Sequence, residues 1–211
     1  MPLGEARPQT AYHGRLTNNE IAAMSARNVA VIVGSLRKGS FTRRTAKALI
    51  GLAPASLDCH FVEIGDLPLY DEDLEAGGAP AAWVRFRDEV GAGQAVLFAT
   101  PEYNRSVPGA LKNAIDVGSR PYGHSVWKGK PAAVVSTSPG ALGGFGANHH
   151  LRQSLVFLDM PVMQQPEAYL GQVAHMVAED FTIPDEKTRG FLTGLMQAFA
   201  DWIALTLAKP A

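Results

Sequence analysis

The chain has 211 residues, a formal net charge of -1 at pH 7 and 46% hydrophobic residues. This length suits one domain with its own core, and the near-neutral charge gives no bulk electrostatic reason to expect nucleic acid or an acidic membrane as a partner. The single cysteine, Cys59, excludes an internal disulfide. Its apolar, strand-like surroundings favour a buried and inert thiol over a reactive one.

Targeting, membrane and metal signals are not recognisable in the sequence. No apolar run reaches the roughly 18 residues of a spanning helix, and the first residues lack the basic-then-apolar pattern of a secretory signal. No C-x-x-C motif or His/Cys cluster indicates a metal site. The acidic residues between 71 and 75 fit a solvated loop better than a cation site. We therefore expect a cytoplasmic protein without a bound metal.

The pattern of apolar residues predicts one domain over residues 27–211, preceded by a polar arm over residues 1–26. In chain order, the expected elements are a strand at 29–33, a helix at 41–52, a strand at 57–64, a loop at 66–80, a helix at 81–90, a strand at 95–99, a helix at 107–117 with Pro108 in its first turn, a strand at 132–135, a helix at 145–158, a short fifth strand at 160–163 and a helix at 185–207.

Alternation of strands and helices predicts parallel strands joined by right-handed crossovers, with helices on both faces. Five such strands fit an α/β, flavodoxin-like three-layer sandwich with strand order 2-1-3-4-5. Ligands of open parallel sheets bind at the carboxyl ends of the strands, where the strand order reverses. We therefore expect the loops after the first, third and fourth strands to form the functional site.

The first of these loops, residues 34–42, has the chemistry of an anion site. Its glycines allow a tight turn, its hydroxyls and Arg37 offer donors, and it leads into a helix whose free N–H groups and dipole favour negative charge. It matches neither G-x-x-x-x-G-K-[ST] nor G-x-G-x-x-G, so the nucleoside triphosphate and dinucleotide fingerprints both fail. A plain strand-to-helix turn with Ser/Thr capping remains an equal alternative for this loop alone.

The other two loops, residues 100–109 and 136–146, offer backbone groups, an aromatic ring and several glycines. A flat heteroaromatic ligand needs such a mixture of polar edges and apolar surface. A Pro-rich turn and an ordinary Gly-rich loop are the simpler interpretations of the two segments.

The motifs G-S-L-R-K-G-S-F-T, P-E-Y-N-R-S-V-P-G-A-L-K-N-A-I-D and S-P-G-A-L-G-G together resemble those of the NAD(P)H-dependent FMN reductase family. Within it, the sequence is most similar to the bacterial chromate/quinone reductases. The resemblance covers roughly residues 29–166. It implies a flavodoxin-like fold, bound FMN, a homodimer or homotetramer, and reduction of quinones, chromate, azo compounds or free flavin by NADPH or NADH.

By position, the resemblance also implies the contacts of the cofactor. The flavin phosphate would be held by Ser35, Arg37, Ser40, Phe41 and Thr42. The isoalloxazine would be lined by Pro101, Glu102, Tyr103 and Asn104, and its other side or the nicotinamide entrance by Ser138, Gly140, Gly143 and Gly144. Arg105 and Ser106 would lie near the substrate or nicotinamide.

Three positions depart from the family pattern. Val117 stands where an aromatic residue often follows the aspartate, which would change packing near the site. Thr42 stands where the family usually has Asn, and Arg105 stands at a position that is often aromatic, where a cation would change substrate choice or subunit contacts. No side chain is assigned as catalytic, because the flavin performs the chemistry; Tyr103 or water is the candidate for proton transfer.

Two other classes of function remain open from the sequence. One is a flavodoxin-type electron carrier without its own reductase turnover, although such carriers tend to be strongly acidic and this chain is not. The other is a nucleotide-binding regulatory module that uses the Gly-rich third loop.

Overall fold

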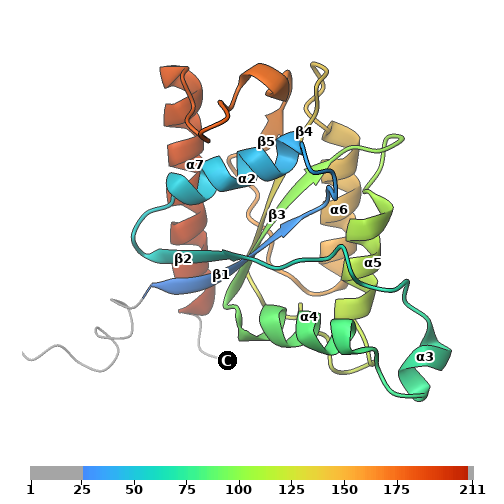
Figure 1. The fold of residues 1–211 in the computed structure, drawn as a ribbon. Coiled ribbons are helices and arrows are strands. Elements are labelled where there is room, and N and C mark those ends of the chain that lie inside the picture. The colour runs from blue at the N-terminus through green and yellow to red at the C-terminus, as the bar shows by residue number, and fades with distance from the viewer. Residues whose placement is uncertain (1–25, 209–211) are drawn as a thin grey trace, which may run out of the picture.

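The computed structural model describes residues 26–208 and contains a five-stranded parallel sheet (Figure 1). The strands are β1 (Arg27–Val33), β2 (Leu57–Phe61), β3 (Ala95–Pro101), β4 (Ala132–Thr137) and β5 (Ala168–Leu170). Their order is β2-β1-β3-β4-β5, which confirms the predicted flavodoxin-like arrangement. The predicted polar arm, apart from Ala26, lies outside the described residues.

Helices cover both faces of the sheet. They are α2 (Phe41–Gly51), α3 (Glu72–Ala76), α4 (Ala81–Ala92), α5 (Gly109–Gly118), α6 (Phe145–Phe157), the short 3-10 helix η1 (Val173–His175) and α7 (Glu186–Leu207). One layer consists of α2 and α7, and the opposite layer of α4, α5 and α6 (Figure 1).

The central strand β1 explains why the sequence specifies three layers. Val29, Val31 and Val33 pack into the core beneath α2 and α7, whereas Ala30 and Ile32 pack into the core beneath the other three helices. Both faces are fully covered from Val29 to Val33, and all five of these residues are apolar, as expected of a strand buried on both sides. The same reasoning applies to β3 and β4, which makes the middle of the sheet the rigid base of the loops at its carboxyl edge.

The predicted fifth strand at residues 160–163 is wrong. Val162 forms only an isolated parallel bridge with Ala132, near the beginning of β4. The true edge strand, β5, pairs with the end of β4, and Val135 is opposite Ala168. Pro161 lacks an N–H for a ladder, while the three-residue β5 is too short to give a recognisable apolar pattern.

Two predicted boundaries on the helical side also need correction. The helix predicted to start at Val107 begins at Gly109, because Val107 precedes a proline and Pro108 is the extended N-cap residue with ψ 142°. The segment predicted as a loop at 66–80 contains the one-turn helix α3, capped by Asp71, whose carboxylate accepts the N–H of Asp73. A local side-chain cap of this kind starts a short helix without any apolar periodicity.

The last helix, α7, is long and apolar enough to cross a membrane by length and composition alone. Its N-cap is Asp185, and its buried side chains pack on the same core as α2. A core helix of a domain passes the same length test, so this is weak evidence for a membrane span.

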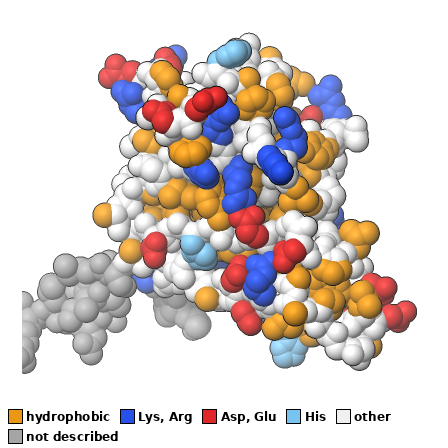
Figure 2. Space-filling model, viewed as in Figure 1, with side chains coloured by type: hydrophobic (Ala, Val, Ile, Leu, Met, Phe, Trp, Pro, Cys, Tyr) orange, Lys and Arg blue, Asp and Glu red, His pale blue; other side chains and the backbone are white. Residues whose placement is uncertain are grey.

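Charge is unevenly distributed over the surface. On the face shown in Figure 2, Lys and Arg side chains gather over α2 and the loop that precedes it. This gathering stands out because the chain as a whole carries a net charge of -1.

Candidate functional site

The chain leaves β1 through Gly34 at a point where a side chain would be crowded. A Cβ there would lie 3.1 Å from Cδ2 of Leu111 and 3.1 Å from Oγ1 of Thr100. The N–H of Gly34 continues the sheet by donating to the carbonyl of Ala99 at 2.8 Å. Glycine thus lets the first loop begin directly beside β3, at the predicted switch point.

The start of α2 provides the donors of an anion site. Ser40 is the N-cap residue, and its hydroxyl accepts the N–H of Arg43 at 3.1 Å. The backbone N–H groups of Phe41 and Thr42 have no hydrogen-bond partner among residues 26–208. Free N–H groups in the first helical turn, together with the helix dipole, attract anions. The exposed Arg37 stands at the edge of the same corner.

The hydroxyl of Thr42 is buried and joins two of the three loops. It lies 2.7 Å from the hydroxyl of Thr137, at the end of β4. This contact braces the end of the first loop against the beginning of the third.

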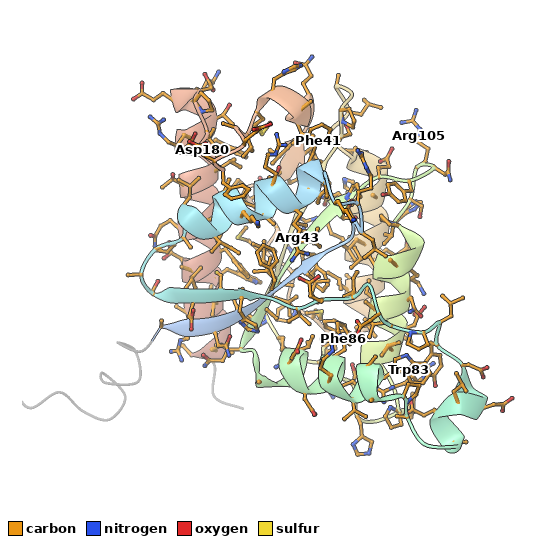
Figure 3. The ribbon with its side chains drawn as sticks, viewed as in Figure 1. Phe41, Arg43, Trp83, Phe86, Arg105 and Asp180 are labelled. Carbon is orange, nitrogen blue, oxygen red and sulfur yellow. The ribbon has the colours of Figure 1, made fainter. Side chains whose placement is uncertain are left out.

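The second loop folds into a tight hairpin. Tyr103 and Ser106 exchange backbone hydrogen bonds of 3.1 and 3.0 Å, and the two residues between them, Asn104 and Arg105, have φ angles of 51° and 66°. Two successive positive φ angles give the turn type that suits a two-residue hairpin, although arginine rarely adopts it. The side chain of Arg105 is 77% exposed and points away from the body of the protein (Figure 3).

Glu102 anchors this hairpin to α6. One carboxylate oxygen accepts the N–H of Ala147 at 3.0 Å, in the first turn of a helix whose N-cap residue, Gly144, has no side chain to cap it. The other oxygen lies 3.7 Å from the guanidinium of Arg105. The negative charge of Glu102 therefore compensates the exposed N–H groups and dipole of α6.

The third loop places two glycines behind the wall of the cleft. Gly143 and Gly144 have φ angles of 61° and 76°, and a Cβ on Gly143 would lie 2.4 Å from the backbone of Tyr169. They turn the chain into α6 against the edge strand. Ser138 lies at the front, where its hydroxyl donates to the carbonyl of Gly140 at 2.9 Å.

The three loops enclose a cleft of about 230 Å³. Nine of the residues predicted from the sequence line it together: Ser35, Arg37, Ser40, Phe41, Thr42, Pro101, Glu102, Tyr103 and Ser138. Six predicted residues do not: Asn104, Arg105 and Ser106 belong to the hairpin outside it, Gly140 lies on the exposed surface, and Gly143 and Gly144 are packed behind it.

Three further residues line the cleft and were not predicted: Thr137, Pro139 and Val173. Thr137 and Pro139 flank Ser138, so extending the predicted site along its own loop would have included them. Val173 belongs to η1, directly after β5. Because β5 was misplaced, nothing in the sequence indicated that the chain returns here.

The cleft combines an anion-binding corner with apolar and aromatic walls, and its volume is below that of a typical small-molecule pocket. Among the described residues, no group of three or more His, Cys, Asp or Glu side chains could hold a metal ion. No nucleophile with an adjacent base lines the cleft. The donor set suits the phosphate end of an elongated ligand whose remaining part extends towards the mouth beside Tyr103.

A doubly wound sheet of this order, with a phosphate-type site at the first loop, defines the class of flavodoxin-like, mononucleotide-binding α/β proteins. Comparison with known proteins specifies the family. Residues 27–175 match the family model described as NADPH-dependent FMN reductase, and the chain belongs to this family of oxidoreductases.

Individual relatives agree with the family. A quinone reductase of Pseudomonas putida is 65% identical over 181 residues, which are 86% of this chain and 97% of that protein. A 2-hydroxy-1,4-benzoquinone reductase of Burkholderia sp. is 43% identical, over 83% of this chain and 95% of its own length. Among solved structures, the flavoenzyme NAD(P)H:(acceptor) oxidoreductase FerB of Paracoccus denitrificans is similar with a TM-score of 0.82 and 48% identity, over 86% of this chain and 99% of that chain.

Proposed function

We propose that this protein binds FMN in the cleft and reduces quinones with NADPH or NADH. The observation that carries the proposal is the meeting of an anion-binding helix start with apolar and aromatic walls in one cleft at the switch point. Membership of the family supports FMN and NAD(P)H, and the quinone reductases among the relatives support a quinone as acceptor.

In this proposal the FMN phosphate lies at the start of α2. The N–H groups of Phe41 and Thr42 donate to it, and Arg37 supplies the positive charge. The hydroxyl of Ser40 accepts from Arg43, so its own hydrogen is free to donate to a phosphate oxygen. Ser35 is buried beside this corner and offers a further hydroxyl.

The flavin ring then extends between the second and third loops. When bound, FMN supplies the redox chemistry, accepting a hydride from the reduced nicotinamide and passing two electrons to the acceptor. Pro101, Tyr103 and Pro139 provide surface for the ring and limit the access of water. The exposed hairpin residues Asn104 and Arg105 lie where an acceptor or nicotinamide approaches, so they act on specificity more than on FMN affinity.

An FMN titration followed by steady-state kinetics tests the proposal. We expect one FMN per chain and oxidation of NADPH or NADH with parallel double-reciprocal plots when a benzoquinone is varied, as in ping-pong kinetics. Chromate, an azo dye and free flavin serve as comparison acceptors, and the quinone should have the highest kcat/KM. Stoichiometric FMN without turnover would make the protein an electron carrier, and failure to bind FMN would contradict the whole proposal.

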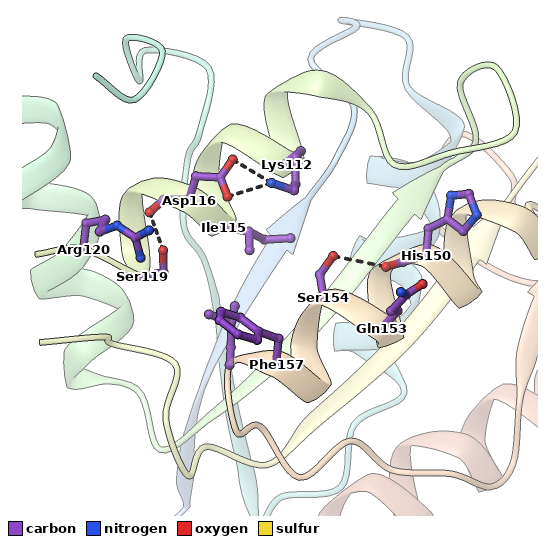
Figure 4. A pocket seen from close by; sticks show the side chains of 10 residues that line it. Lys112, Ile115, Asp116, Ser119, Arg120, His150, Gln153, Ser154 and Phe157 are labelled. Atoms are coloured by element: carbon purple, nitrogen blue, oxygen red, sulfur yellow. Dashed lines mark hydrogen bonds and ion pairs between the residues drawn. The ribbon is translucent and has the colours of Figure 1, made fainter. Parts of the chain in front are cut away.

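A homodimer or homotetramer is part of the same proposal. A groove of about 530 Å³ lies between α5 and α6, and Phe157 stands near one end of it (Figure 4). The side chains of Val156 and Phe157 are 72% and 87% exposed. Exposed apolar side chains beside a groove suit a self-complementary twofold contact, in which each copy places its α6 end against the groove of the other.

Light scattering coupled to size-exclusion chromatography tests this assembly. Phe157→Asp should shift the protein towards the monomer. Leu69→Asp, which changes an exposed leucine (77%) that does not line the groove, should not. A monomeric wild type, or an unchanged mass for Phe157→Asp, would exclude this surface as the contact.

A cytoplasmic location completes the proposal. NADPH and NADH are the reductants of that compartment, and the chain has a single cysteine. Burial raises the pKa of the Cys59 thiol to about 11, which supports the expected inert cysteine.

A further inference from the structure

The basic cluster over α2 extends beyond the proposed FMN site. Arg37 faces the cleft, but the other four basic residues line a second hollow of about 270 Å³, between α2 and the segment that follows η1. They are Lys38, Arg43, Arg44 and Lys47. Ser40 borders both the cleft and this hollow, so the two are neighbours across the first loop.

The hollow carries an excess of positive charge. Arg43 is paired with the exposed Glu63, with Nη1 3.0 Å from Oε2. Within residues 26–208, no carboxylate lies at ion-pair distance from Lys38, Arg44 or Lys47. The single acidic residue that lines the hollow is Glu179. Three cations without carboxylate partners on one small surface repel one another, which an anionic ligand would relieve.

Arg44 is held in place without being neutralised. Its Nη1 donates to the carbonyl of Val177 at 3.3 Å, and its guanidinium lies 5.6 Å from the centre of the Phe41 ring. These contacts orient the side chain at the wall of the hollow while leaving its charge uncompensated. An arginine fixed in this way is prepared to bind a phosphate.

An aromatic ring stands at the rim of the same hollow. Phe181 has a φ of 68°, a strained conformation for a bulky residue, and its side chain is 41% exposed. The turn is closed by hydrogen bonds from Phe181 to Ala178 and from Ala178 to Thr182. The ammonium of Lys47 lies 4.4 Å from the ring centre. In this conformation the Phe181 ring is therefore partly exposed beside the cations and is not buried in the core.

We propose that this hollow binds the 2′-phosphate of NADPH, with the adenine against Phe181, and that it makes the enzyme prefer NADPH to NADH. This inference rests on the proposed function, because the nicotinamide end of the dinucleotide has to reach the FMN cleft. Lys47 is seven residues beyond Ser40, about 10 Å along the helix axis, so the hollow lies about 10 Å from the phosphate end of the cleft, and an extended dinucleotide would have to span this distance and the cleft itself. The 2′-phosphate is the chemical difference between the two reductants, and Lys38, Arg44 and Lys47 are its partners.

The double variant Arg44→Gln/Lys47→Gln tests the assignment on the FMN-loaded protein. The KM for NADPH should rise by roughly tenfold for each cation removed, the value of a charge-assisted hydrogen bond, with kcat and the NADH parameters unchanged. The charge-preserving Lys47→Arg should stay close to wild type. Arg27→Gln, at the amino end of β1 and so at the opposite end of the strands from the cleft, should leave the KM for both reductants unchanged. Lys47→Gln alone, at an exposed side chain, covers the case in which the double variant folds poorly.

The variant Phe181→Ala tests the proposed adenine contact separately from the phosphate contact. Because both reductants carry adenine, this variant should raise the KM for NADPH and NADH by the same factor. An effect on NADPH alone would contradict the placement of the base.

Calorimetry with adenosine 2′,5′-bisphosphate and 5′-AMP gives a readout independent of turnover. The FMN-loaded wild type should bind the bisphosphate more tightly, and the double variant should lose that difference. Equal binding of the two probes to wild type, or an unchanged bisphosphate affinity in the double variant, would overturn the inference even if quinone reduction is normal.

Vesicles of phosphatidylglycerol test the alternative of a membrane surface. If the wild type binds them, the double variant does not, and neither binds the bisphosphate, the inference is overturned and the patch is assigned to a membrane surface. Absence of turnover with both reductants would contradict the proposed function, and the calorimetric result would then decide whether the hollow binds the 2′-phosphate.

Discussion

Replacing Glu102 with alanine should destabilise the protein by removing the contact between the second loop and α6. The carboxylate is 12% exposed and accepts the N–H of Ala147 at 3.0 Å, where the N-cap Gly144 provides no side-chain acceptor. A lost N-cap costs about 0.5–2 kcal/mol, and a charge-assisted hydrogen bond is worth about 1.5–3 kcal/mol. These figures describe the same contact, so we expect a loss of about 2 kcal/mol in the free energy of unfolding. For a domain of this size, the melting temperature would fall by roughly 4–8 °C.

Urea and thermal unfolding of the FMN-free protein measure this loss without interference from cofactor affinity. Glu102→Gln keeps a hydrogen-bond acceptor but not the charge, so its free energy of unfolding should fall by about half as much as that of Glu102→Ala. Arg105→Ala is the matched control: it removes the 3.7 Å ion pair of Glu102 through a side chain that is 77% exposed, and exposed pairs contribute less than about 1 kcal/mol. If Arg105→Ala destabilised the protein as much as Glu102→Ala does, the capping argument would be refuted.

Three further outcomes are expected. Arg37→Ala should weaken FMN binding by roughly 10–100-fold in a fluorescence titration, the value of a hydrogen bond to a charged group, and should leave the unfolding free energy of the FMN-free protein unchanged because the side chain is exposed. Gly118→Ala should cost about 1–3 kcal/mol in urea unfolding, since its Cβ would lie 2.6 Å from the buried Trp127 indole; an undamaged variant would show that the indole moves freely. Cys59, whose pKa is raised to about 11 by burial, should react with iodoacetamide at pH 8 roughly a hundredfold more slowly than a free thiol and faster as the pH rises, whereas rapid labelling at pH 8 would contradict the burial.

The central part of the fold could be predicted because each inner strand is buried on both faces. Runs such as Val29–Val33 have no polar position, and that pattern, alternating with helices, specifies a parallel sheet between two layers. The edge of the sheet could not be predicted as well. β5 has three residues, with buried Ala168 and Leu170 on either side of a half-buried tyrosine, and such a short alternation resembles any loop.

The candidate site was predictable where it depends on strand order and less so where it depends on contacts distant in sequence. Loops after β1, β3 and β4 meet at the switch point of any sheet with this order, so their residues could be grouped in advance. The bond between Glu102 and Ala147 joins residues 45 positions apart, and the one between Thr42 and Thr137 joins residues 95 apart. No local pattern encodes such pairs. The same holds for Val173, which reaches the cleft only because β5 ends beside it.

The polar groups of the site form two sets: those that hold its parts together and those that are free to bind a ligand. The side chain of Thr42 joins the start of α2 to the end of β4. Glu102 and Ser106 join the second loop to α6, the latter through His150, whose ring nitrogen lies 2.9 Å from the Ser106 hydroxyl. Arg37 makes no such contact among the described residues, and neither do the first N–H groups of α2. The cleft is therefore held in shape by its own walls before a ligand enters, which lowers the entropic cost of binding. It follows that substitutions of the bracing residues should change stability first and affinity second, whereas substitution of Arg37 should change affinity alone.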